Sequence, residues 1–108
     1  MYTKISVYSI QENKKEEFLD LMEESQEIFL NHLGGNVKYL RSVKNPEEWI
    51  QISQFENQSL YDEQIAEIRE RLEEIHYDDR LRELVSENDK QIPEADYEEF
   101  MSIIHEEE

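Results

Sequence analysis

Hydrophobic and polar positions divide the first part of the chain into a strand and a helix. Residues 2–10 alternate between two faces and are rich in β-branched and aromatic side chains, which is typical of a half-buried strand. From Lys14 onwards the spacing changes to that of one face of an α-helix. The positions on this face are Phe18, Leu21, Met22, Ser25, Ile28, Phe29 and His32. Gly34 and Gly35 supply the left-handed conformations that end a helix.

The middle of the chain has the pattern of a β-hairpin followed by a second helix. Residues 37–43 alternate again, residues 49–55 are a third run of β-forming side chains, and a proline turn at 44–47 separates them. Ser59, with Asp62 three residues later, is close to a capping box and predicts the start of a helix. Its expected buried positions are Tyr61, Gln64, Ile65, Ile68, Leu72 and Ile75.

The last third of the chain is patterned less clearly. The second helical stripe breaks at residues 76–79, and leucines and a valine within 81–85 predict a short further helix. A polar link is expected over residues 88–96. Residues 97–104 fit helical spacing as well as residues 100–104 fit a strand. We assign the fourth strand to residues 100–104, because a strand there completes a common order of elements.

That order predicts an α+β, ferredoxin-like fold. Strand, helix, strand, strand, helix, strand is the β-α-β-β-α-β arrangement of one antiparallel sheet with its helices on one face. We expect residues 1–108 to form a single domain of this type. The other face of such a sheet is bare, so its side chains indicate what packs against it.

The expected register places aromatic side chains on the bare face. If Ile5, Val7, Ile50 and Ile52 face the helices, the alternating side chains line the opposite face. These are Ser6, Tyr8, Trp49, Gln51, Ser53 and Phe55. An aromatic face open to solvent predicts a second copy of the chain packed sheet to sheet around a two-fold axis. A shift by one residue would exchange the two sets.

Composition restricts the classes of partner. The 108 residues include 28 acidic and 11 basic side chains, a formal net charge of −17, which disfavours nucleic acids and anionic membranes as partners. With 37% hydrophobic residues the chain can build one modest core. It has no cysteine, which excludes disulfides and thiolate sites and fits a reducing compartment. No apolar run approaches the roughly 20 residues of a membrane span, so we expect a soluble, cytoplasmic protein.

The element order, together with three local features, resembles the dimeric α/β-barrel superfamily, and in particular small proteins of the antibiotic-biosynthesis-monooxygenase type. The features are the helix end His32-Leu33-Gly34-Gly35, the hairpin over residues 37–49, and the link Gln54-Phe55-Glu56-Asn57-Gln58-Ser59. The resemblance implies a homodimeric α/β barrel with a pocket for a small organic molecule between sheet and helices. It also implies three alternatives for activity: cofactor-independent oxygenation of phenolic substrates, haem binding and degradation, or ligand binding without chemistry.

The haem alternative is poorly matched by the residues. Haem degraders of this superfamily use an Asn on the first strand and a His and a Trp on the second helix. The corresponding places here hold Tyr8 or Ser6, Glu74 and Gln64, and His76 lies beyond the ligand position. His76 could ligate haem, or it is an exposed histidine at a helix end. We expect no cofactor and no metal, and the sequence has no EF-hand, HExxH, phosphate-loop or GxSxG motif.

The remaining candidate residues suit a flat organic ligand. Aromatic and polar side chains expected to share one sheet face form the candidate pocket: Tyr8, Tyr39, Trp49, Gln51 and Phe55. Packing against a second subunit explains their aromatic members equally well. His32 is a candidate general base, or a histidine complementing the helix end. Arg41, or Gln51, is a candidate for stabilising an oxyanion, and Arg41 could instead pair with an acidic neighbour.

Two functions of different classes therefore follow from the sequence. The first is a homodimer with a small-molecule pocket and a cofactor-independent, monooxygenase-like activity on an aromatic substrate. The second is a non-enzymatic module whose acidic helical face, residues 63–83, binds a basic partner.

Overall fold

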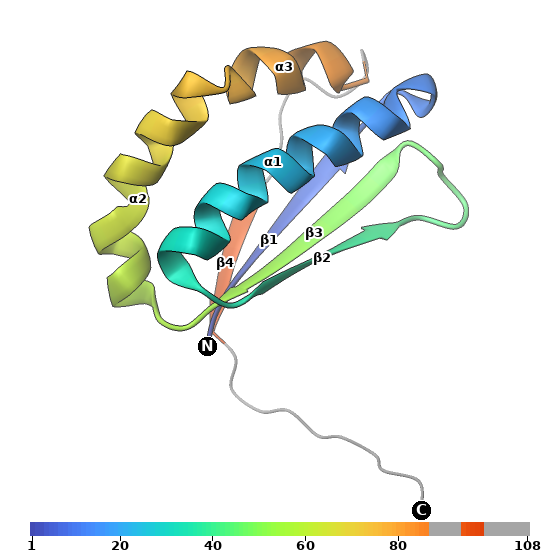
Figure 1. Cartoon of the computed structure of the whole chain (residues 1–108). Coiled ribbons are helices and arrows are strands. Elements are labelled where there is room, and N and C mark those ends of the chain that lie inside the picture. Colours follow the sequence, from blue (N-terminus) through green and yellow to red (C-terminus); the bar gives the residue numbers. More distant parts are fainter. Residues whose placement is uncertain (87–93, 99–108) are drawn as a thin grey trace, which may run out of the picture.

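The computed structural model describes residues 1–86 and 94–98. The elements in chain order are β1 (Tyr2–Ser9), a 3-10 turn η1 (Glu12–Lys14), α1 (Lys15–Leu33), β2 (Asn36–Arg41), β3 (Glu48–Phe55), α2 (Gln58–Glu74), α3 (Tyr77–Leu84) and β4 (Glu94–Glu98) (Figure 1). The strands form one four-stranded sheet in the order β2-β3-β1-β4, and each neighbouring pair is antiparallel. This is the ferredoxin-like α+β arrangement that the sequence predicts.

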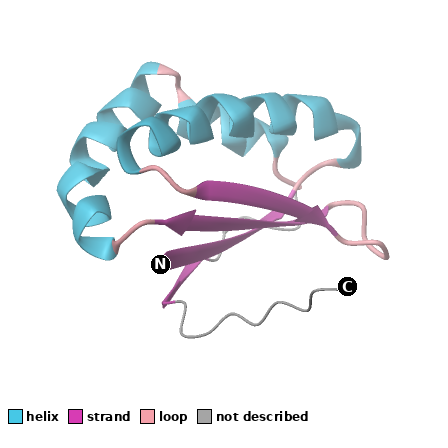
Figure 2. Cartoon of the chain, turned by 60° about the horizontal axis from the view of Figure 1, so that its bottom comes forward, coloured by secondary structure: helices cyan, strands magenta, loops and turns pink. Residues whose placement is uncertain are grey.

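The helices lie on one face of the sheet, as Figure 2 shows from the side. α1 crosses the centre of the sheet, and α2 and α3 follow one another along its flank with a bend between them (Figure 1). Over the part of the chain that the structure describes, no element covers the opposite face. None of the described helices is long and apolar enough to cross a membrane.

The two faces of the sheet are the reverse of our expectation. Tyr8 pairs with Trp49 across β1 and β3, and their rings lie 5.4 Å and 5.3 Å from that of Phe18 on α1. The aromatic set therefore faces the helices, and the aliphatic set lies on the open face. The physical reason is size: large rings fill the space between a twisted sheet and its helices and bury more apolar area than Ile or Val does.

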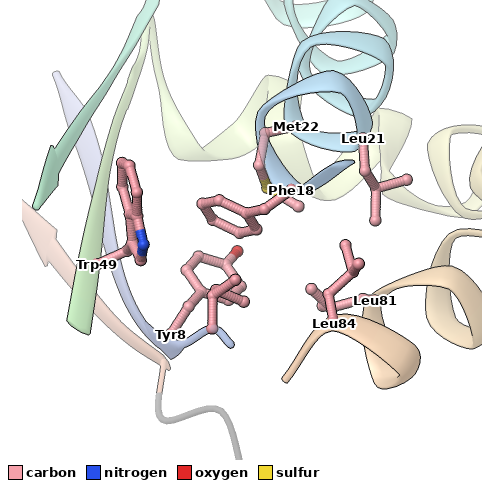
Figure 3. Packing of buried hydrophobic residues seen from close by; sticks show 8 residues of the cluster. Tyr8, Phe18, Leu21, Met22, Trp49, Leu81 and Leu84 are labelled. Atoms are coloured by element: carbon pink, nitrogen blue, oxygen red, sulfur yellow. The ribbon is translucent and has the colours of Figure 1, made fainter. Parts of the chain in front are cut away.

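The core consists of two apolar clusters at opposite ends of the sheet. One gathers side chains from β1 and the residue that follows it, and from β3, α1 and α3 (Figure 3): Tyr8, Ile10, Phe18, Leu21, Met22, Trp49, Leu81 and Leu84. The other lies under α2 and consists of Tyr2, Leu33, Phe55 and Ile68. Because the clusters are separate, the layer between sheet and helices is not apolar throughout.

Local signals placed the helix and hairpin boundaries well. The N–H of Gly34 bonds to the carbonyl of Leu30 at 2.8 Å and closes α1. Gly35 has φ +94°, and a Cβ there would collide with the Gln54 carbonyl oxygen, so a glycine is required. The start of α2 differs from the prediction: the cap is Asn57, whose Oδ1 accepts from the Leu60 N–H at 2.7 Å, and Ser59 already lies inside the helix.

The last strand also lies earlier than predicted. β4 (Glu94–Glu98) pairs with β1, and its first residues fall in the segment that we expected to be a polar link. An edge strand is held by backbone hydrogen bonds to one neighbour and commonly carries charged residues, so its polar composition concealed it. The expected strand at 100–104 lies outside the described residues.

Candidate functional site

The middle of the helix-facing side of the sheet is polar. Ser6 on β1 and Gln51 and Ser53 on β3 are 3%, 7% and 1% exposed. Polar side chains buried in a core cost free energy unless they have partners, so their concentration here points to a site. With aromatic side chains from both layers they surround a cavity of about 50 Å³, lined by Lys4, Ser6, Tyr8, Gln26, Phe29, Gln51, Ser53, Phe55, Tyr61 and Tyr77.

Gln51 is the centre of a hydrogen-bond network. Its Oε1 accepts from the hydroxyl of Tyr8 at 3.0 Å and from that of Tyr39 at 2.9 Å. Its Nε2 donates to Ser53 Oγ at 2.9 Å. Because both ends of the amide are engaged, its orientation is fixed, and the network connects β1, β2 and β3.

Tyr39 of this network and the neighbouring Tyr77 stay protonated near neutral pH. Burial, and secondarily the nearby Tyr8, raise the pKa of Tyr39 far above its ordinary value of 10.0. Burial also raises the pKa of Tyr77, and a hydrogen bond between the Tyr77 and Tyr8 side chains adds to the effect. These hydroxyls therefore act as neutral hydrogen-bond donors or acceptors and do not supply a tyrosinate base.

Lys4 brings a positive charge to the cavity wall. Its Nζ donates to the Tyr61 hydroxyl at 3.0 Å and lies 4.6 Å from the centre of the Tyr61 ring. An ammonium next to a small cavity favours the anionic form of any acidic group bound there.

Gln26 presents an acceptor whose partner is missing among the described residues. The side chain belongs to α1, is 5% exposed and lines the cavity. Its Oε1 is buried and has no hydrogen-bond partner in the described part of the chain. A buried acceptor without a donor costs roughly 1–3 kcal/mol, and an N–H or O–H donor in the cavity would remove that cost.

Of the residues proposed from the sequence, three line the cavity and two support it. Tyr8, Gln51 and Phe55 are cavity residues. The Tyr39 hydroxyl donates to Gln51, which lines the cavity. Trp49 packs in the apolar cluster beside Phe18.

His32 and Arg41 do not line the cavity. His32 lies in the last turn of α1, where Nδ1 is 2.9 Å from the Ile28 carbonyl and Nε2 is 3.8 Å from Glu67 Oε1. Arg41 donates from Nε to the Pro46 carbonyl at 2.8 Å and lies 5.4 Å from the Trp49 ring centre. Their contacts stabilise the α1–α2 packing and the hairpin.

Sequence reasoning missed the polar and helical part of the wall. Gln26 and Phe29 lie three positions apart on α1 and so on one face, and Lys4 and Ser6 share the face of Tyr8 on β1. These periodicities contained the signal: the sequence placed Ser6 on the same face as Tyr8, but we named neither Lys4 nor Ser6 as a pocket residue. Tyr77 follows the break between two helices, where no periodicity applies. Over the described residues, no group of three or more His, Cys, Asp or Glu side chains could hold a metal ion.

Comparison with solved structures confirms the fold. A variant of SnoaB, a cofactor-independent oxygenase from Streptomyces nogalater, superposes with a TM-score of 0.73 at 12% identity, over 94% of this chain and 95% of that one. A nipsnap family protein of unknown function from Agrobacterium tumefaciens gives 0.66 at 21% identity, over 90% and 86%. A Nitrosomonas europaea protein classed with antibiotic biosynthesis monooxygenases gives 0.66 at 17% identity, over 94% and 100%.

These likenesses establish the class of fold that the sequence resemblance indicated. The chain has the ferredoxin-like fold of antibiotic-biosynthesis-monooxygenase-type proteins. No family model matches the sequence, and no curated protein is similar enough in sequence to match it. The neighbours differ in their described functions, so the fold alone assigns no activity.

Proposed function

We propose that the protein binds a small hydroxylated aromatic molecule in the cavity between sheet and helices. The observation that carries the proposal is Gln26: it lines the cavity together with Lys4 and the fixed Gln51 amide, and its buried Oε1 has no hydrogen-bond partner among the described residues. A hydroxyl group of the ligand would donate to Gln26, and its ring would lie among Phe29, Phe55 and Tyr61. A single polar contact then orients an otherwise apolar ligand.

The reaction that suits this site is cofactor-independent oxygenation of an activated ring. A ring CH₂ group, through its enolate, reacts with O₂ and yields a C=O group and H₂O, so the substrate supplies the electrons. Lys4 would favour the enolate by its charge. The neutral tyrosine hydroxyls would hold the amide network rigid while the anion forms. The proposal gives no role to His32 or Arg41, because neither lines the cavity.

We further propose that the protein works as a homodimer packed through the open sheet face. The pairs Val7–Ile50 and Ile5–Ile52 run along the centre of that face. Leu40 and Tyr97 at its sides are 47% and 51% exposed. An apolar sheet face of this extent favours burial, and a second copy around a two-fold axis would cover it with the same residues.

The direct test uses anthrone as the probe, because its activated CH₂ lies between two aromatic rings and its enol tautomer carries the hydroxyl group that would donate to Gln26. An oxygen electrode would measure O₂ uptake, and absorbance would follow anthraquinone. The proposal predicts protein-dependent uptake with one anthraquinone formed per O₂, and its loss in Lys4→Met. Anthrone that binds without turnover would reject the oxygenation step and retain the binding site. Absence of both would reject the proposed function.

A further inference from the structure

The cavity is too small for an aromatic ring unless its wall moves. Its volume of about 50 Å³ can hold a few water molecules, whereas a dry cavity of about 150 Å³ is what accommodates benzene in a protein core. Binding of the proposed ligand therefore requires a side chain that can leave the wall without dismantling the sheet.

A second, larger hollow lies in the angle between α2 and α3. This groove has a volume of about 460 Å³ and is lined by the last turns of α2 and the first turns of α3, including Arg69, Leu72, Tyr77 and Arg82. That volume is within the roughly 300–1,000 Å³ typical of ligand pockets. Tyr77 is the one described residue that lines both the groove and the cavity.

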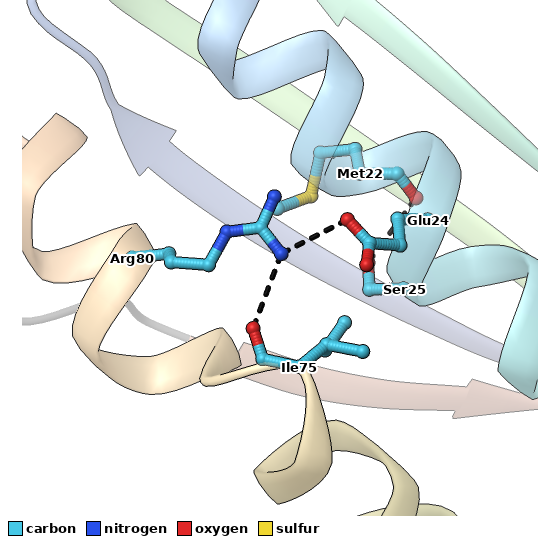
Figure 4. Close-up of polar contacts among 5 residues, drawn as sticks. All are labelled: Met22, Glu24, Ser25, Ile75 and Arg80. Atoms are coloured by element: carbon cyan, nitrogen blue, oxygen red, sulfur yellow. Dashed lines mark hydrogen bonds and ion pairs between the residues drawn. The ribbon is translucent and has the colours of Figure 1, made fainter.

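The backbone at this point is built as an elbow. His76 adopts a left-handed conformation, φ 57° and ψ 41°, and α3 starts at Tyr77. Arg80, one turn further on, donates to the Ile75 carbonyl at 3.1 Å and to Glu24 of α1 at 2.9 Å (Figure 4). α3 is thereby held against α1, so the Tyr77 side chain can rotate about a fixed backbone.

We infer that the Tyr77 ring is the gate through which the ligand enters, and that the occupied site extends from the cavity into the groove. This inference rests on the proposed function. In the closed state the ring separates the two spaces. When it swings outward, they join, and Leu72 and the Tyr77 ring itself provide apolar surface for the outer part of the ligand.

The charges of the groove restrict the outer part of the ligand. The groove lining contains two positive side chains, Arg69 and Arg82, and three negative ones: Glu73, Asp78 and Asp79. Arg82 Nη1 lies 3.5 Å from Asp79 Oδ1. The groove thus has no excess positive charge to bind a carboxylate or phosphate, and the whole chain repels anions with its net charge of −17. The inferred ligand is an elongated, uncharged molecule with a hydroxylated aromatic head.

Thiol labelling tests the gate without any ligand. The chain has no cysteine, so Ser53→Cys places a single thiol in the cavity wall. Uncharged, aromatic dithiodipyridine would report its accessibility by absorbance. Tyr77→Ala, which removes the ring, is expected to speed labelling by about tenfold or more. Tyr77→Phe, which keeps the ring and removes the side-chain hydrogen bond to Tyr8, is expected to speed labelling by about threefold.

Two controls separate gating from unfolding. Ser25 is fully buried on α1 and lies outside the cavity lining, so Ser25→Cys reports opening of the core in general. Tyr39→Phe removes a hydroxyl from the same network at a residue that does not itself line the cavity, so it reports the effect of a weakened network alone. If Tyr77→Ala speeds labelling of the thiol at position 53 and not of the thiol at position 25, the gate is supported. Equal acceleration at positions 53 and 25, or none at 53, overturns it, even if the protein binds anthrone.

Discussion

The Tyr8 hydroxyl donates a hydrogen bond to Gln51 Oε1 at 3.0 Å in the layer between sheet and helices. Tyr39 donates to the same atom from the neighbouring strand, so one amide group connects three strands. The arrangement places a rigid polar network between the sheet and the helices, and it forms one wall of the candidate site.

The network predicts a large loss of stability when Gln51 is replaced. Gln51→Leu would leave the hydroxyls of Tyr8 and Tyr39 and the Ser53 Oγ without their partner. We expect a loss of about 2–4 kcal/mol in the free energy of unfolding, measured in urea. Gln58→Leu, at an exposed position in the first turn of α2, is the matched control and should change it by less than about 0.5 kcal/mol. Equal effects of the two changes would contradict the network.

Replacement of Gln26 should have the opposite effect on stability. Its Oε1 is buried without a partner among the described residues, so Gln26→Leu removes an unsatisfied acceptor at nearly constant volume. We expect the free protein to gain about 1 kcal/mol and to bind anthrone at least about tenfold more weakly, measured by calorimetry. Loss of stability together with unchanged binding would show that Gln26 is a structural residue.

The open sheet face predicts a charge-sensitive dimer. Ile50 lies at the centre of that face, opposite Val7. Ile50→Lys would place an ammonium in the proposed interface and should weaken dimerisation roughly hundredfold, about 3 kcal/mol. Sedimentation velocity measures the effect. Asn31→Lys, an equal change of charge on the exposed side of α1, should leave the dimer intact, and identical behaviour of both variants would exclude this interface.

The raised pKa values of Tyr39 and Tyr77 predict a loss of stability in alkali. Near neutral pH these hydroxyls are protonated in both the folded and the unfolded chain and contribute no pH dependence. Above the ordinary pKa of 10.0 the unfolded chain ionises them, while the folded protein keeps them protonated. Each group therefore lowers the free energy of unfolding by about 1.4 kcal/mol per pH unit above that point.

Ultraviolet titration at the tyrosinate band checks this account. Above pH 10 the free energy of unfolding should fall less steeply with pH in Tyr39→Phe and in Tyr77→Phe, because each variant lacks one of the two buried groups. If the folded protein titrates all its tyrosines near their ordinary pKa, the buried network is not as we describe it.

Short-range patterns predicted most of the fold because they act locally. The glycine pair ends α1, the proline turn forms the hairpin, and the spacing of apolar residues defines α2. β4 was misplaced because its pairing with β1 is a long-range backbone contact that side-chain pattern does not report. The position of the α2 cap differed by two residues, since Asn57 and Ser59 are both good caps.

The candidate site was only partly predictable, for one physical reason. Alternation reveals two faces of a strand without saying which the helices cover, and here both faces carry apolar side chains. Tyr8, Gln51 and Phe55 were correctly grouped on one face, but that face was assigned to the dimer. The helical contributions, Gln26 and Tyr77, depend on how α1 and α3 pack over the sheet, which no local pattern contains.

Native mass spectrometry of the protein, purified from cells and then incubated with anthrone, reads the subunit count and the bound ligand together. We predict a dimer that carries the added mass of one small molecule in each subunit, and a Gln26→Leu dimer that carries none. Bare protein in both cases, or equal retention by both, would contradict the claim that the cavity around Gln26 is the ligand site.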